Sequence, residues 1–228
     1  MFNVKNALRN RRTRNKVMAI ASAGLVVGVG AAMTLATWTD TEWDYAGAGN
    51  GLPGIGTSTF VVQQDATNPY TGAAFGNFHT NPGNALDFET GALVLSPGDS
   101  VAAPVAYETT SNSVAGTLQL NAAVKASTIA SNDTGDALWN ALVLQVGWMS
   151  VAPGGTVPAC TASLTGFAPI AMTGTGLSAV PAATTQTLQA ATGNVLHYCF
   201  VITLPAGSSN SLQGRTVAPA WQFSAVSS

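Results

Sequence analysis

The sequence predicts an all-β fold: a single β-sandwich or jelly-roll-like domain after an N-terminal signal helix, with at most one or two short helices. Two observations carry this prediction. Short apolar or alternating runs recur along the body of the chain between turn residues, and no regular alternation of strands with helices accompanies them. At 228 residues, the chain is long enough for a leader and one domain of ordinary size.

The first 37 residues have the pattern of an export signal. Residues 1–16 hold six of the eight basic residues and form an n-region, and residues 17–36 form a hydrophobic segment without charge or proline. We therefore predict a signal peptide over residues 1–37. A retained membrane anchor is the alternative, because twenty apolar residues can just span a bilayer. The many alanines and glycines of the segment favour cleavage.

The cleavage region is predicted from the small residues that end the hydrophobic segment. Thr34 and Ala36 suit the two positions that a signal peptidase reads before the cut, and Leu35 and Thr37 suit them less well. The cut is therefore expected around Ala36, Thr37 and Trp38.

Six runs in the body are predicted to be strands, because each is apolar or alternates with period two. They lie at residues 58–64, 100–108, 115–124, 141–148, 195–204 and 216–225. Between them, the Pro97-Gly98-Asp99 sequence predicts a turn in which Asp99 caps its own backbone. A short helix is expected from Asp133 to Leu142. Residues 65–84 and 150–194 are predicted to be mainly loops.

Cys160 and Cys199 are the two cysteines, and both lie in the region predicted to be exported. In an oxidising compartment they are expected to form one disulfide, which would tie the 150–194 connection to a core strand. Closing a loop of about 40 residues would add roughly 4 kcal/mol in the chain-entropy model. The alternative is a pair of free, buried thiols. A structural zinc site is not expected from two cysteines alone.

Charge and motif content exclude several classes of function. Beyond residue 37 the chain has two basic and ten acidic residues, a net charge of 2 − 10 = −8, which argues against binding to nucleic acid. Contact with a membrane is expected only through an uncleaved signal segment. His79 and His197 belong to no metal-binding motif, and no nucleophile or phosphate-binding motif is present. We predict no catalytic, cofactor or metal site.

An acidic group follows the predicted cut, formed by Asp40, Glu42 and Asp44. Carboxylate oxygens are ligands for calcium, but such a group is more often a solvated segment, which is the interpretation that we prefer.

Three motifs carry a resemblance to a known family. Residues 36–42 read ATWTDTE, which resembles the alternate export signal cut by SipW-type signal peptidases. Residues 93–124 contain an L-x-P-G-D turn before a strand, a polar turn and another strand. Residues 210–226 contain an N-x-x-Q-G segment before a final strand. The last two resemble parts of TasA and camelysin-like proteins. Residues 125–195 match no family pattern.

The resemblance implies a secreted cell-surface or extracellular-matrix protein of biofilms, and the lack of a catalytic motif predicts that it is not an enzyme. Its partners would be a SipW-type signal peptidase and further copies of itself in a fibre, with an accessory matrix or cell-wall protein as a further candidate. In such fibres an N-terminal segment of one subunit completes a sheet of the next. Here that donor segment would be residues 38–57, before a sandwich domain at 58–228, with Trp38, Trp43 and Tyr45 as candidates for self-association. The glycine-rich stretch 46–56 contains Pro53 and argues against one continuous donor strand.

Two other classes of function stay open from the sequence. One is a secreted camelysin-like peptidase, since part of the resembling family carries a metallopeptidase label. The other is a monomeric binding module on the cell surface, for which a sandwich with variable loops would suffice.

Overall fold

The computed structural model describes residues 41–42, 54–88 and 90–228. Residues Thr57–Ser228 form one compact unit, which holds every strand described below. The predictions for the signal peptide, for Ala36, Thr37 and Trp38, and for Trp43 and Tyr45 concern residues outside the described part of the chain. In that part, no helix combines the length and the apolar character needed to cross a membrane.

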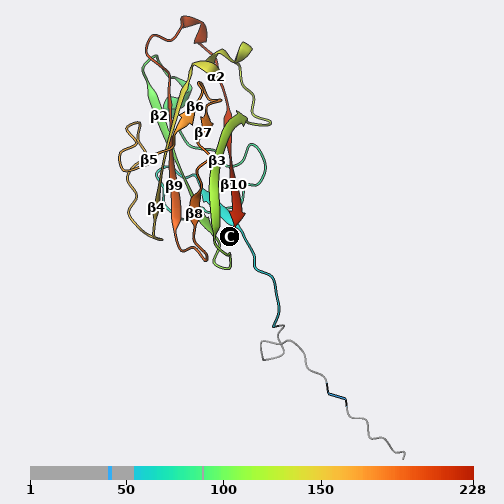
Figure 1. Cartoon of the computed structure of the whole chain (residues 1–228). Helices are drawn as coiled ribbons and strands as arrows, with labels where there is room; N and C mark the ends of the chain where they lie inside the picture. The colour runs from blue at the N-terminus through green and yellow to red at the C-terminus, as the bar shows by residue number, and fades with distance from the viewer. Residues whose placement is uncertain (1–40, 43–53, 89) are drawn as a thin grey trace, which may run out of the picture. The chain divides into compact units, whose positions relative to one another are not determined.

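The unit is an all-β sandwich of antiparallel sheets, as the sequence predicts (Figure 1). The larger sheet has the order β1-β2-β9-β4-β5, the smaller one the order β10-β3-β8, and β6 and β7 form a separate pair. The strands are β1 (Val62–Asp65), β2 (Ser100–Thr109), β3 (Gly116–Lys125), β4 (Val143–Val151), β5 (Ala168–Pro169), β6 (Met172–Thr173), β7 (Val180–Pro181), β8 (Gln186–Leu188), β9 (Val195–Thr203) and β10 (Pro219–Ser227). The helical elements are η1 (Thr90–Leu93), η2 (Thr134–Asp136), α2 (Ala137–Ala141) and η3 (Asn210–Leu212).

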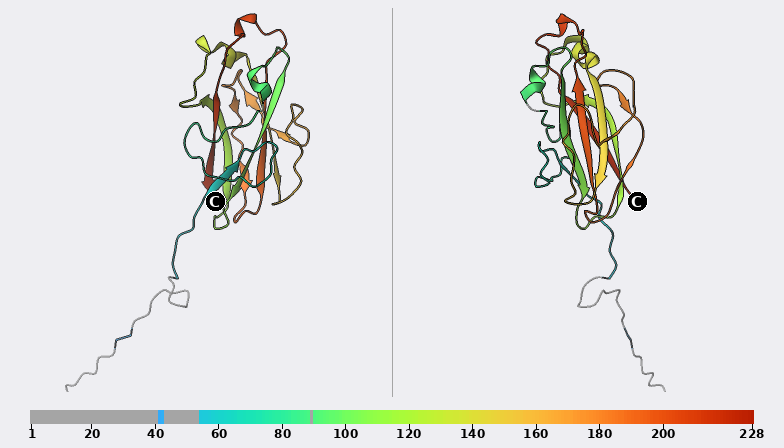
Figure 2. Two further views of the ribbon diagram at one scale, coloured as in Figure 1. Left: turned by 180° about the vertical axis from the view of Figure 1, so that it is seen from behind. Right: turned by 90° about the vertical axis from the view of Figure 1, so that its left-hand side faces the viewer.

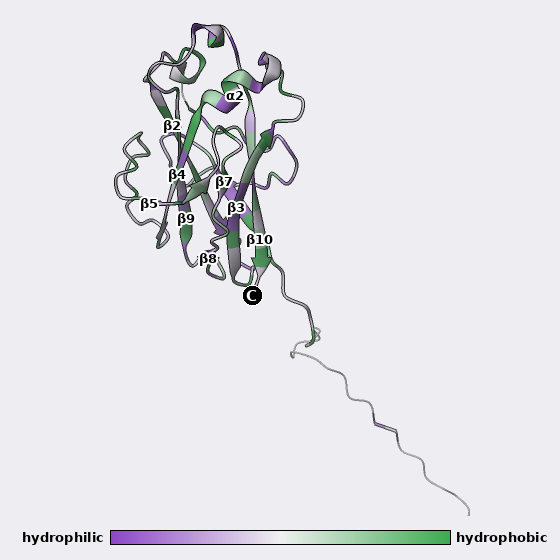
Figure 3. Ribbon diagram, turned by 45° about the horizontal axis from the view of Figure 1, so that its top comes forward, coloured by the Kyte–Doolittle hydropathy of each residue, from purple (hydrophilic) through white to green (hydrophobic). Residues whose placement is uncertain are grey.

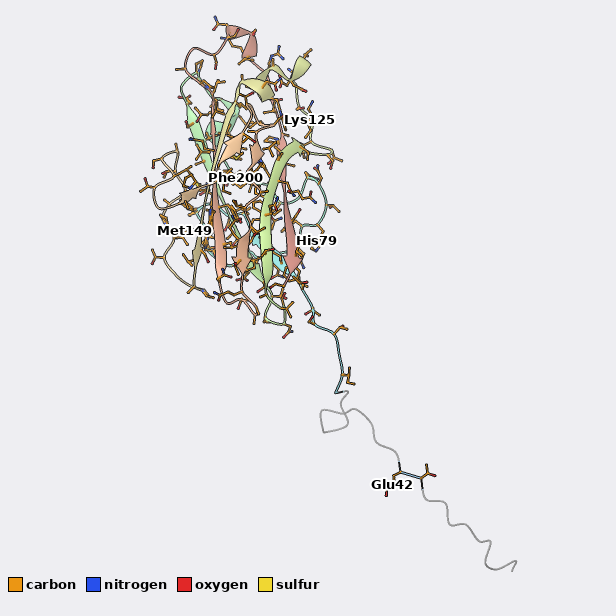
Figure 4. All side chains as sticks on the ribbon, viewed as in Figure 1. Glu42, His79, Lys125, Met149 and Phe200 are labelled. Atoms are coloured by element: carbon orange, nitrogen blue, oxygen red, sulfur yellow. A yellow bond between two sulfur atoms is a disulfide. The ribbon has the colours of Figure 1, made fainter. Side chains whose placement is uncertain are left out.

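Strand β9 is the centre of the larger sheet, and its residues from Val195 to Ile202 are all buried. Alternate side chains of β9 face the smaller sheet, where the ring of Phe200 lies 4.7 Å from that of Trp221 and the ring of Tyr198 lies 4.8 Å from that of Phe223. Figure 4 shows Phe200 in the middle of the body. These aromatic contacts join the two sheets into one core.

Loops cover the opposite face of β9. Cys199 and Val201 pack with Phe167, which belongs to the connection between β4 and β5. The ring of Tyr70, from the segment after β1, lies 4.5 Å from the ring of His197 at an angle of 83°. This explains why β9 reads as an almost continuous apolar run, since both of its faces are buried.

The expected helix forms, in a shorter version. Residues Thr134–Asp136 make a 3-10 turn and Ala137–Ala141 make α2. The carboxylate of Asp133 accepts hydrogen bonds from the backbone N–H groups of Leu138 (2.9 Å) and Trp139 (2.8 Å). Asp133 therefore satisfies two donors at the start of the helix that would otherwise lack partners.

Both ends of the described unit lie on one side of it. Thr59 pairs with Ser113, and the backbone N–H of Ser228 donates to the carbonyl of Ala115. Helix α2 and η3 lie at the other end of the sandwich (Figure 1). The chain therefore enters the unit at the end where β10 leaves it.

Candidate docking groove and free sheet edge

A long groove opens between the edges of the two sheets, with a volume of about 1580 Å³. One wall is the chain from Ser208 to Ala225, which includes most of β10, and the other wall is formed by residues 60–64 and by parts of the segment 76–95. Side chains of the sandwich core form its floor, among them Tyr107, Leu118, Leu142 and Ile202. These four side chains are each exposed by 8% or less, so the groove ends against a core that is itself closed.

Strand β10 presents an unpaired edge to this groove. Within the part of the chain that the structure describes, β3 is the one strand that pairs with β10. Its residues Trp221 and Phe223 turn their rings toward Phe200 and Tyr107, so they belong to the core. The next residues toward the C-terminus, from Ser224 to Ser227, are exposed. An exposed edge of nine residues is a template for another strand.

One polar atom on this strand is buried without a partner. The indole Nε1 of Trp221 has no hydrogen-bond acceptor among the described residues. A buried N–H left unpaired costs about 1 to 3 kcal/mol. An acceptor brought into the groove by another chain could remove this cost.

Exposed apolar side chains gather along the groove. Five of the large hydrophobic residues that are most exposed belong to its lining, in contrast to the scattered single residues of an ordinary surface. They are Phe78 (44% exposed), Leu93 (82%), Val94 (75%), Val124 (52%) and Ile129 (50%). Figure 3 shows apolar stretches in green along the strands, interrupted by hydrophilic residues. The lining therefore suits an apolar partner.

A strap, residues 77–84, borders the groove. It starts beside β1, where Gly76 and Gln64 exchange two backbone hydrogen bonds of 2.9 Å. Asn81 fastens it to the end of β3: the Asn81 side chain donates to the carbonyl of Lys125 (3.1 Å) and accepts from the N–H of Ser127 (2.7 Å). Figure 2 shows this part of the chain, in teal, looping outside the strands, and Figure 4 shows His79 on the same side.

The predicted disulfide is present. Cys160 and Cys199 are bonded, with their Cα atoms 5.3 Å apart, and the bond fixes the segment after β4 onto the outer face of β9. The predicted cap is confirmed too, because the Asp99 carboxylate accepts a hydrogen bond of 2.8 Å from the N–H of Ser96.

The two histidines lie in different environments. His79 is exposed in the strap, whereas His197 is 3% exposed and its Nε2 has no hydrogen-bond partner among the described residues. The Tyr70 ring covers His197, so this side chain of β9 does not face solvent. Burial lowers the pKa of His197 to about 4, and the nearby charge of Asp65 opposes this shift only in part.

Two carboxylates, Asp65 and Glu108, lie on the neighbouring strands β1 and β2, and the charge of Asp65 also acts on His197. Asp65 is fully buried and accepts hydrogen bonds from the N–H (2.9 Å) and hydroxyl (2.7 Å) of Thr67. Partial burial, and then the charge of Asp65, raise the pKa of Glu108.

In the described residues, no group of three or more His, Cys, Asp or Glu side chains is placed to hold a metal ion. Of the acidic residues 40, 42 and 44, the described one is Glu42, which is exposed.

The comparisons with known proteins give no family. No family model matches the chain, and no curated protein is significantly similar to it. The resemblance to TasA and camelysin-like proteins is therefore a hypothesis that depends on its three motifs.

Proposed function

We propose that this protein is a secreted structural protein of the cell surface or extracellular matrix, and that it assembles into fibres by strand exchange. In this proposal, the N-terminal segment of one copy, within residues 38–57, fills the groove of another. The observation that carries the proposal is the groove of about 1580 Å³, which reaches the core beside the free edge of β10.

The other sheet edges offer less to an incoming strand. Strand β5 has two residues and β8 has three, and β1 already bonds to Gly76. Strand β10 has nine residues, so it is the longest edge that is free among the described strands. Soluble proteins usually shorten, charge or cover such edges, and β10 carries no charged residue. An edge of this kind is expected to have a partner.

An added strand would interact with the groove in two ways, through its backbone and through its side chains. Backbone hydrogen bonds to β10 would supply affinity, and alternate side chains of the donor would fill the space above Tyr107 and Leu118. Burial of one large aromatic side chain contributes roughly 1.5 to 3 kcal/mol. Trp38, Trp43 and Tyr45 are the aromatic residues that the N-terminal segment offers for this purpose.

Export is part of the proposal. The disulfide between Cys160 and Cys199 is compatible with an oxidising compartment, where such bonds form and persist. The signal pattern of residues 1–37 and the motif at residues 36–42 support release by a SipW-type peptidase.

The test compares the mature protein, which begins at Trp38, with a version that lacks residues 38–50. We expect the mature protein to form large species in sedimentation velocity and fibres in negative-stain micrographs. The truncated version should keep the circular dichroism spectrum of a β-sandwich and sediment as a monomer, since the core residues lie beyond residue 57.

A matched pair of variants separates the aromatic side chains from the acidic ones. Replacement of Trp43 and Tyr45 by Ser should weaken assembly by several powers of ten in affinity, because several kcal/mol of burial is lost. Replacement of Asp40 and Asp44 by Asn keeps the aromatic side chains and should leave assembly intact. The proposal is wrong if the truncated protein still assembles, or if it unfolds because the segment packs on its own subunit.

A further inference from the structure

We propose that the peptide bond between Arg215 and Thr216 is a latent cleavage site for proteases that cut after basic residues, and that the ion pair of Arg215 with Asp133 keeps such proteases from it. This proposal does not depend on the proposed function. It gives a role to the segment that contains the N-x-x-Q-G motif at residues 210–214, which Arg215 follows directly.

A protease of the trypsin type can attack the predicted mature chain at two bonds, because from residue 38 onward Lys125 and Arg215 are the basic residues. Such a protease takes the basic side chain into a pocket that contains an acidic residue. It reaches exposed connections far more readily than paired strands. A bond is therefore protected when its basic side chain is held elsewhere, or when its backbone is paired within a sheet.

Lys125 is protected by its backbone. It is the last residue of β3 and pairs with Pro219 of β10, and the N–H of the next residue, Ala126, donates to the carbonyl of Ala218 (2.8 Å). Its ion pair with Asp136 adds little, because the two side chains are 64% and 46% exposed. Figure 4 shows Lys125 at the end of β3. The bond after Lys125 is therefore accessible only when β3 and β10 separate.

Arg215 lies instead in the connection between η3 and β10. Most residues from 206 to 216 are exposed, and Leu212 is the hydrophobic residue of this stretch that packs against the core. Beyond Arg215, the backbone of Thr216 exchanges two hydrogen bonds of 3.0 Å with Asn132, which form an isolated bridge. Exposed connections with few buried contacts are the places where local opening and proteolysis concentrate.

The guanidinium of Arg215 fastens this connection to the start of α2. Its Nη1 donates to the Asp133 carboxylate (3.0 Å) and to the carbonyl of Thr134 (2.6 Å), and its Nε donates to the carbonyl of Ser211 (2.9 Å). The side chains of Arg215 and Asp133 are 23% and 4% exposed, so salt screens this pair less than it screens an exposed one. The guanidinium that a protease must bind is therefore already held by the protein itself.

Asp133 is a firmly placed partner for Arg215. The backbone N–H groups of Leu138 and Trp139 hold its two carboxylate oxygens. Asparagine at this position keeps one oxygen that can cap the helix, and it lacks the negative charge. Asp133→Asn therefore weakens the contact with Arg215 while it preserves a cap for α2.

Cleavage at this site would act on the groove. Hydrolysis adds one water across the bond and leaves a carboxylate on Arg215 and an amine on Thr216. The piece from residue 216 to the C-terminus contains all of β10. Because the chain from Ser208 to Ala225 is one wall of the groove, the cut would interrupt that wall.

The test treats the mature protein and two matched variants with trypsin under native conditions, and mass spectrometry identifies each cut. The native protein should persist, since both bonds are protected. Asp133→Asn should be cut after Arg215 at least about tenfold faster than the native protein, because the rate of cleavage follows the population of the open form. Asp136→Asn, which removes the exposed partner of Lys125, should be as resistant as the native protein.

Two further variants separate the role of the guanidinium from that of the protease. Arg215→Lys keeps a basic residue but lacks the planar fork, so it should be cut at this position faster than the native protein. Arg215→Gln offers no basic side chain to trypsin. It should resist trypsin and still show faster amide hydrogen exchange over residues 206–216, because the connection is no longer fastened.

The position of the cut distinguishes local opening from global unfolding. A variant that is cut after Lys125 as readily as after Arg215 has unfolded as a whole, and this result for Asp133→Asn would overturn the proposal. Resistance of Asp133→Asn equal to that of the native protein would overturn it too, as would rapid cleavage of the native protein after Arg215. Cleavage of Asp136→Asn after Lys125 would show that Arg215 is not the one latent site, and would also contradict the proposal.

Discussion

His197 shows how a single buried side chain sets a dependence of stability on pH. It is 3% exposed in the central strand, its Nε2 has no partner among the described residues, and burial lowers its pKa to about 4. An unfolded chain would bind a proton at the ordinary pKa of about 6.5. The unfolded state therefore takes up more protons as the pH falls from about 6.5 to about 4, and the free energy of unfolding decreases over that window.

We expect this loss to reach about 2.5 kcal/mol between about pH 7 and about pH 4.5, from roughly 1.4 kcal/mol per pKa unit. Chemical denaturation at about pH 7 and about pH 4.5 measures it. His197→Asn should remove most of the pH dependence, and His79→Asn, at an exposed position, should keep it. Glu108 acts in the opposite sense because its pKa is raised, but it is unchanged in both variants and cancels from their difference. Equal pH dependence in His197→Asn and the native protein would contradict this role for His197.

At the scale of elements, Asn81 fastens the strap along the groove, through its side chain and through its backbone carbonyl, which accepts a hydrogen bond from the Ser127 hydroxyl. Asn81 makes the two side-chain hydrogen bonds that join the strap to Lys125 and Ser127, and nearly every residue from 77 to 84 is exposed. Asn81→Ala should reduce the free energy of unfolding by no more than about 1 kcal/mol, because the site is open to water. It should instead accelerate amide hydrogen exchange in residues 77–84, since little apolar contact holds the strap.

Asn84→Ala is the matched control, because Asn84 lies in the same strap and is less exposed than Asn81. Hydrogen exchange followed by mass spectrometry compares the two variants peptide by peptide. Unchanged exchange over residues 77–84 in Asn81→Ala would show that other contacts hold the strap.

The longer elements could be predicted from sequence because each is an apolar or alternating run of nine or ten residues. Strands β2, β3 and β9 begin within one residue of the expected positions. Strand β1 starts four residues later than predicted, because Thr59 makes an isolated bridge to Ser113 before the regular ladder begins. Strands β5 to β8 have two or three residues each, which is too short for an alternation of apolar and polar side chains to be recognised. The sequence therefore predicts a loop over the segment 150–194.

The groove could not be predicted in the same way. Its walls come from residues about 150 positions apart in the chain, and local patterns do not tell which strand ends up at a sheet edge. Leu93 and Val94 are apolar and exposed, and the sequence does not tell which surface they share. Their exposure indicates a docking surface because both line the groove. The disulfide was predictable because two cysteines in a body that is predicted to be exported leave one pairing.

At the scale of the whole molecule, the proposed assembly would join the body of one copy to the N-terminal segment of another. The body has a groove beside β10, and the segment contains the aromatic residues Trp43 and Tyr45. A head-to-tail contact that does not close on itself would give a filament rather than a ring.

The most direct measurement follows the assembly of the mature protein in the presence of a synthetic peptide of residues 38–47. The peptide should occupy the groove and bind to each body with a stoichiometry of one to one. At saturating concentration it should therefore stop growth of the large species in sedimentation velocity. A peptide with Ser in place of Trp43 and Tyr45 should have no effect. Assembly that proceeds at the same rate with the native peptide would contradict strand exchange through the groove.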